Sequence, residues 1–364
     1  MSTFPTTPEQ PTPTPMPAQA RTNTVVMGRQ DFMSVLLRLI GVELYKFRRR
    51  VMSKVLSIIG IVLMVLVFLV ISIGTIFVVN TTSATYLPPQ CSAVRDPQGP
   101  QNPNGQPCLD HTPTQAELAQ AQQSRQEQLN AVSSPLRLPL SLYIAVQIMQ
   151  VVGLVLVIII AGTIVGGEYS VGTVRLMSTR GPTRTQYLLS KIGALLVCIV
   201  VGFVFIVLIG LVIGALLNLV SGIATNTDFL SNGGIGHMIL YALFGMLGLF
   251  VYSMLALFLA TLGRATAAGV AGALVWWVLE NVLSGILAVV AILVKGPSGD
   301  FLKAVPDYFI GNNIGALLQN QQQYFIGSPP SSLSNLHAAL VLLVYLVLFI
   351  GLSVFVTLRR DITN

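Results

Sequence analysis

The chain has 364 residues, of which 53% are hydrophobic and only 9% are charged. Soluble domains carry about 25% charged residues, so this composition excludes a soluble globular protein and indicates an integral membrane protein. The formal net charge of +7 invites a nucleic-acid-binding interpretation. The positions of the basic residues explain that surplus through membrane topology instead, and no nucleic-acid partner is predicted.

Residues 1–24 are rich in proline, threonine and glutamine. They have almost no large apolar side chains and lack the apolar run of a signal peptide, so we predict a disordered cytosolic tail. Residues 31–54 differ, because apolar residues recur there at helical spacing between basic ones. This pattern predicts an amphipathic helix lying in the lipid headgroup layer, and a plain cytosolic extension of the first membrane helix stays open as the alternative.

Six apolar runs follow, and each is long enough to cross roughly 30 Å of hydrocarbon. They are Val55–Val79, Leu140–Val165, Ile192–Leu217, Ile239–Leu262, Ala265–Val294 and Leu336–Leu358. Because backbone groups find no water partner in lipid, each run is predicted to be a helix. The expected fold is an all-α polytopic membrane protein, with six transmembrane helices over residues 55–358 and an N-terminal interfacial amphipathic helix.

The basic residues predict the orientation in the membrane. With the N-terminus in the cytosol, fifteen of the 20 lysines and arginines fall on the inner side. The positive-inside rule therefore places both termini in the cytosol, including a short tail over residues 359–364. We expect a multi-pass protein of the cell (plasma) membrane.

Three outer segments result from this orientation, and two of them are informative. The outer loop 80–139 contains Cys91 and Cys108, and a disulfide between them is compatible with an oxidising outer space, although the sequence does not decide whether they are bridged. The outer segment 295–335 contains a moderately apolar stretch, Pro306–Gln319, which is too short to span the membrane. It is expected to be a short helix at the outer face, a re-entrant piece or a packed lid.

The sequence contains no phosphate-binding loop and no metalloprotease or nucleophile-elbow motif, so no catalytic, cofactor-binding or metal-binding residue is predicted. Glu280 is the exceptional residue, because it lies near the middle of the fifth apolar run, beside Asn281. A charged, lipid-facing carboxylate there costs about 2.5 kcal/mol or more. We interpret Glu280 and Asn281 as candidates for a substrate path or a gate. The alternative is that Glu280 is a protonated or hydrogen-bonded packing residue.

A polar segment, residues 167–191, separates the second and third apolar runs with the sequence GEYSVGTVRLMSTRGPTRTQYLLSK. In the predicted orientation it is cytosolic. Val171–Thr179 can form a short helix that Gly181 and Pro182 end. Such a structured, basic loop indicates a docking surface for another protein.

This segment resembles the one that follows the second membrane helix in permease subunits of ABC-2-type transporters. The matching positions are Glu168, Gly172, Thr173, Arg175, Pro182, Arg184 and Lys191. The upstream stretch LIGVELYKFRRR resembles the N-terminal interfacial helix of that family, with Glu43 and Lys46 at matching places. Phe258–Gly269 resembles the tight turn between its fourth and fifth helices.

The resemblance implies a permease subunit of an exporter that pairs with a second permease subunit as a homodimer or heterodimer. It also implies a cytosolic ATP-binding subunit that grips residues 171–178 as a coupling helix. ATP and Mg would then be bound by that partner, and this chain alone would not be an enzyme. The outer loop 80–139 is longer than in simple members of the family, which leaves the substrate open. Two other interpretations remain: a stand-alone channel or secondary carrier that uses Glu280, and a membrane-anchored sensor or assembly protein.

Overall fold

The computed structural model describes residues 32–82, 138–171, 183–221, 233–294 and 296–359, with scattered residues between Thr114 and Glu127. Within these ranges the chain forms helices and no strand, and six helical spans are long and apolar enough to cross a membrane. The predicted all-α, six-helix membrane fold is therefore confirmed. The spans are α2 (Val51–Thr82), α4 (Leu140–Ile148) continued by the π-helical turn η2 (Met149–Gly153) and α5 (Leu154–Val171), α7 (Arg184–Ser221), α8 (Gly234–Gly263), α9 (Thr266–Leu293) and α12 (Asn335–Arg359).

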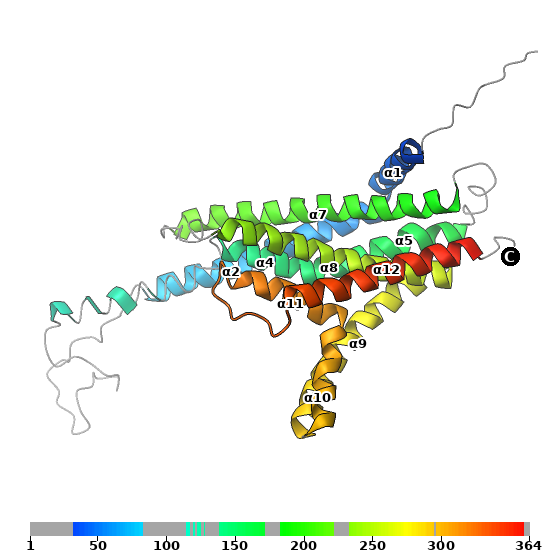
Figure 1. The fold of residues 1–364 in the computed structure, drawn as a ribbon. Helices are drawn as coiled ribbons and strands as arrows, with labels where there is room; N and C mark the ends of the chain where they lie inside the picture. The colour runs from blue at the N-terminus through cyan, green and yellow to red at the C-terminus, as the bar shows by residue number, and fades with distance from the viewer. Residues whose placement is uncertain are drawn as a thin grey trace, which may run out of the picture.

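The amphipathic helix α1 (Phe32–Arg49) lies across one end of this bundle and packs mainly against α7 (Figure 1). The same end holds the last turn of α5, the start of α7 and the last turn of α12. Arg184 shows this proximity directly, because its Nη1 donates a hydrogen bond to the carbonyl oxygen of Leu358 at 3.1 Å. We call this end of the molecule the α1 end.

The opposite end carries three short elements: α10 (Pro297–Ala304), the 3₁₀ turn η4 (Val305–Tyr308) and α11 (Ile310–Gln322). Helix α11 has 13 residues, about 20 Å, which is too short to span the membrane. It packs against α8 and α12, and its buried residues include Asn313 and Ile314. The ambiguous stretch Pro306–Gln319 is thus a helix packed into the bundle beside a 3₁₀ turn.

Helix α8 lies at the centre of the bundle, in contact with α5, α9, α11 and α12. Its buried residues include Tyr241, Leu249 and Tyr252. Large apolar side chains cover the outward faces of α2, α9 and α12, as is expected where helices face lipid rather than water. The molecule is accordingly a multi-pass membrane protein.

Glycines allow α5 and α9 to approach closely near the α1 end. A Cβ atom added at Gly162 would lie 2.7 Å from Cγ2 of Val270, and one at Gly166 would overlap the backbone of Thr266. The spacing of these two glycines is that of the small-residue motifs that bring membrane helices together. They therefore serve helix packing, as their sequence pattern indicates.

Helix α7 begins at Arg184, well before the apolar run that predicted its start at Ile192. The added residues include Gln186, Ser190 and Lys191, all buried despite their polarity. Hydropathy could not detect this part of the helix, because its side chains are polar. Gln186 and Ser190 form hydrogen bonds with the nearby Thr183 and Tyr187, whereas Lys191 is satisfied by residues of α1 and α5.

Several predicted features fall outside the described residues. They are the N-terminal tail, the cysteine pair Cys91 and Cys108, the coupling segment over residues 172–182, and the last residues of the C-terminal tail. For these segments the expectations stay predictions.

Candidate functional site

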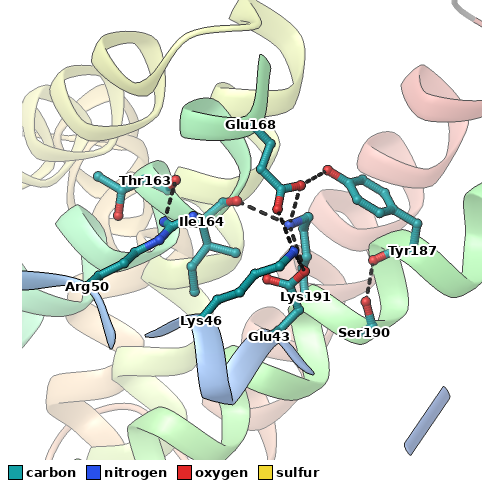
Figure 2. Close-up of polar contacts among 9 residues, drawn as sticks. All are labelled: Glu43, Lys46, Arg50, Thr163, Ile164, Glu168, Tyr187, Ser190 and Lys191. Atoms are coloured by element: carbon teal, nitrogen blue, oxygen red, sulfur yellow. Dashed lines mark hydrogen bonds and ion pairs between the residues drawn. The ribbon is translucent and has the colours of Figure 1, made fainter. Parts of the chain in front are cut away.

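Two glutamates and two lysines from three helices form a buried cluster at the α1 end (Figure 2). Glu43 and Lys46 belong to α1, Glu168 lies in the last turn of α5, and Lys191 lies near the start of α7. Their charges sum to zero, so the group can be buried without a net charge. We call these four residues the ion-pair cluster.

Each lysine of the ion-pair cluster contacts both glutamates. The Nζ atom of Lys191 lies 2.8 Å from Oε2 of Glu168 and 3.5 Å from Oε1 of Glu43. The Nζ atom of Lys46 lies 2.9 Å from Oε1 of Glu43 and 3.2 Å from Oε1 of Glu168. These four contacts between lysine and glutamate join α1, α5 and α7 at one point, although residues 46 and 168 are 122 positions apart in the sequence.

Lys191 is the most deeply buried member, with no exposed side-chain surface. An ammonium group has three N–H donors, and three acceptors surround this one: Glu168, Glu43 and the carbonyl oxygen of Ile164 at 3.2 Å. Its Nζ also lies 4.7 Å from the centroid of the Tyr187 ring, a cation–π contact. A buried charge is tolerated only when it is paired and hydrogen-bonded, and Lys191 meets both conditions.

Tyr187 completes the surroundings of Glu168 by donating a hydrogen bond from its hydroxyl group to Oε2. Its own backbone carbonyl accepts a hydrogen bond from Ser190 Oγ at 2.7 Å. Tyr187 and Lys191 are four residues apart, so they lie on the same face of α7. Residue spacing could have identified Tyr187, had the helix been known to begin before it.

Lys46 is the member nearest to solvent, with 31% of its side chain exposed. Partial burial is the largest single influence and acts to lower the pKa of Lys46. The hydrogen bond to Glu43, together with the negative charges of Glu168 and Glu43, outweighs it and raises the pKa above the ordinary lysine value. Lys46 is therefore charged at neutral pH, and its attraction to both glutamates holds α1 against the bundle.

The other residues of the predicted coupling motif are placed as follows. Arg184 donates hydrogen bonds to the carbonyl oxygens of Thr357 and Leu358, in the last turn of α12, at 3.4 and 3.1 Å. Gly172, Thr173, Arg175 and Pro182 lie outside the described residues. Of the seven predicted positions, the structure thus brings together Glu168 and Lys191, and it adds Glu43 and Lys46 from α1.

A further buried carboxylate, Glu280, lies near the middle of α9 with 7% of its surface exposed. Its Oε2 accepts a hydrogen bond from the Tyr252 hydroxyl group of α8 at 2.8 Å. The backbone N–H groups of Ile310 and Gly311, which begin α11, also interact with this carboxylate. The positive end of the α11 dipole therefore faces the carboxyl group of Glu280. Among the described residues, Oε1 of Glu280 has no hydrogen-bond partner.

Asn281, predicted together with Glu280, points elsewhere. Its side chain is exposed, and its Nδ2 donates a hydrogen bond to the backbone carbonyl of Trp277 at 2.7 Å. Consecutive helical residues project in directions about 100° apart, which separates the two side chains. The partners of Glu280 are Tyr252 and the start of α11, which sequence spacing could not identify because they belong to other helices.

Within the described ranges, no group of three or more His, Cys, Asp or Glu side chains could hold a metal ion. The two described histidines instead make packing contacts. Nδ1 of His237 lies 2.8 Å from Oε1 of Gln321, and its ring stacks on Tyr324. His337 Nε2 lies 3.2 Å from the carbonyl oxygen of Asp307.

Comparison with curated proteins found no match to this chain. The sequence profile of a family described as "Protein of unknown function (DUF2705)" matches residues 133–363. The matched stretch contains α4 to α12 and hence Glu168, Lys191 and Glu280, whereas α1 with Glu43 and Lys46 precedes it. Because the match covers more than half of the chain, this multi-pass membrane protein belongs to the DUF2705 family of proteins of unknown function.

Proposed function

We propose that this chain is the permease subunit of an ABC-2-type transporter that exports its substrate across the plasma membrane. A separate cytosolic subunit would bind ATP and Mg, and a second permease subunit would complete the path. The observation that carries the proposal is the ion-pair cluster, which joins three helices beside the segment 172–182. That segment resembles the coupling segment of ABC-2 permeases.

The position of the ion-pair cluster suits the transmission of force. Glu168 lies just before residues 172–182 and Lys191 lies just after them, and the two side chains are 2.8 Å apart. A partner that moved this connection would therefore move the ends of α5 and α7 together. Glu43 and Lys46 would carry α1 along with them. The low dielectric around a buried pair makes such a junction stiffer than a contact between exposed side chains.

Contacts of α8 offer a route from the α1 end to Glu280. Helix α8 packs against α5, α9 and α11. Its residue Tyr252 holds Glu280, and the start of α11 meets the same carboxylate. We propose that a shift of α5 reaches this contact through α8, and that separation of Glu280 from α11 opens the substrate path.

Copurification with an ATP-binding subunit tests the proposal. The full chain carrying an affinity tag should retain such a subunit, and the complex should hydrolyse ATP. Arg175→Glu should lose the subunit, because it reverses a charge within the segment that the partner would grip. Lys303→Gln, at the other end of the molecule, is the matched control and should retain it.

A stand-alone carrier is the second candidate, because a buried carboxylate with an unpartnered oxygen is typical of ion and proton pathways in membrane proteins. The two functions differ in their energy source. The test is transport by the purified chain in lipid vesicles without any ATP-binding subunit. If wild-type chain transports substrate there and the Glu280→Gln variant does not, the result supports the carrier and contradicts the ATP-driven permease.

A further inference from the structure

The outward face of α1 carries four exposed residues in one line. Arg38, Val42, Tyr45 and Arg49 follow each other at intervals of four, three and four residues, which places them on a single side of the helix. Val42 is 42% exposed and Tyr45 is 57% exposed. The opposite side of α1 presents Glu43 to the ion-pair cluster. We call the four exposed residues the α1 stripe.

The charge of this surface is of one sign. Glu43 is the only acidic residue of α1, and it is buried. Among the described residues, no carboxylate forms an ion pair with Arg38 or Arg49. The guanidinium group of Arg49 lies 4.9 Å from the centroid of the Tyr45 ring. A guanidinium stacked in this way keeps N–H donors at its edge for an oxygen-rich anion.

We propose that the α1 stripe is a binding site for the headgroups of anionic phospholipids. Arg38 and Arg49 are separated by roughly 16 Å along the helix, so each would bind the phosphate of a different lipid. Tyr45 would lie at headgroup level, where tyrosine is enriched in membrane proteins, and Val42 would reach the start of the acyl chains. This site is independent of the proposed transport function.

The surroundings of the stripe favour lipid over a protein partner. Helix α1 ends at Arg49 and the first membrane helix begins at Val51, so α1 lies at the level where the chain enters the bilayer. Helix α1 also exposes Met33 and Leu37, at 60% and 65%. An exposed surface that combines apolar side chains with cations and no carboxylate matches an anionic membrane surface.

The ion-pair cluster determines which side of α1 faces outward. Glu43 and Lys46 hold one side of the helix on α5 and α7, and Ile40 on the same side packs against Gly193 of α7. The helix cannot turn without breaking these contacts. The stripe is therefore presented in a fixed orientation, before any lipid binds.

Lipid titration of the full chain tests the proposal. The protein in zwitterionic detergent micelles is titrated with phosphatidylglycerol or with phosphatidylcholine of the same acyl chains, and bound lipid is counted by native mass spectrometry. We expect saturable binding of phosphatidylglycerol alone. The double variant Arg38→Gln/Arg49→Gln should bind it roughly tenfold more weakly. Lys303→Gln, which removes an exposed charge at the other end of the molecule, should bind it as wild type does.

Three results would overturn the lipid site: equal binding of both lipids, unchanged affinity of the double variant, or full competition by soluble glycerol 3-phosphate, which would indicate a site for free phosphate. Loss of a copurified protein subunit by the double variant, with lipid binding intact, would assign the stripe to protein instead. If the double variant does not fold, salt replaces it as the test. Salt near 1 M shortens the Debye length to about 3 Å, so phosphatidylglycerol binding by the wild type must weaken.

Discussion

Lys191 shows how a single buried charge depends on its neighbours. It has no exposed side-chain surface and is neutralised by Glu168 and Glu43. Lys191→Met would leave two buried carboxylates with one partly exposed lysine. Breaking a buried pair from one side typically costs about 3–5 kcal/mol. We expect a clearly lower thermal unfolding temperature, measured on the purified chain in detergent.

The matched control for Lys191→Met removes the opposing charge as well. In the double variant Glu168→Gln/Lys191→Met the remaining pair, Glu43 and Lys46, is again balanced, so the loss of stability should be smaller than the sum of the two single changes. Additive losses, or a Lys191→Met variant as stable as wild type, would show that these residues do not act as a unit.

A packing role and a gating role for Glu280 predict different effects of replacing this residue. Glu280→Gln keeps the shape and can still accept the Tyr252 hydrogen bond, but it replaces the carboxyl group that meets the start of α11 with an amide that cannot ionise. Under the gating proposal, substrate transport should fall by at least tenfold while the unfolding temperature stays within a few degrees. Wild-type transport with unchanged stability would leave only the packing interpretation.

At the scale of the elements, the local sequence pattern predicted the apolar membrane spans. It missed the parts of helices whose polar side chains are buried against other helices. The six spans were predictable because about 20 apolar residues in a row have few alternatives to a membrane helix. The early start of α7 was not, because Tyr187 and Lys191 are satisfied by α1 and α5. The amide-rich α11 was ambiguous because its sequence does not show that it packs on α8 and α12, and there Asn313 is fully buried.

In the candidate site, too, the sequence revealed single residues but not the contacts between them. Glu168, Lys191, Glu43 and Lys46 were each conspicuous in a chain with few charges, and the family resemblance placed them in two separate segments. Their contact joins residues 122 positions apart, which no local pattern encodes. Likewise, Glu280 was recognisable as an unusual carboxylate, whereas its partner on α8 was not.

The close approach of α5 and α9 gives a prediction that belongs to the helix pair. A Cβ atom at Gly166 would overlap the backbone of Thr266, which has no rotamer with which to yield. Gly166→Ala should therefore push the helices apart and destabilise the protein by about 1–3 kcal/mol. The adjacent Gly167 is a matched control, because a Cβ atom there would meet nothing within 4 Å. Thermal unfolding of both variants checks this, and equal effects would contradict the predicted clash.

At the scale of the whole molecule, the direction of the bundle in the membrane decides which end an ATP-binding subunit could reach. An even number of spans puts α1 and the last turn of α12 at the same end, whereas α10, which contains Lys303, lies away from that end (Figure 1). Most of the lysines and arginines that the structure describes lie toward the α1 end, so the positive-inside rule predicts that it faces the cytosol.

Labelling from outside the cell tests that direction. In a chain whose native cysteines are replaced by serine, Lys303→Cys should react with a membrane-impermeant maleimide on intact cells, because this side chain is 62% exposed. Arg359→Cys, at the exposed end of α12, should react only after the membrane is permeabilised. The reverse pattern would place residues 172–182 outside the cell, beyond reach of cytosolic ATP. It would exclude the ATP-driven permease while leaving the ion-pair cluster unchanged, because the contacts among Glu43, Glu168 and Lys191 do not depend on orientation.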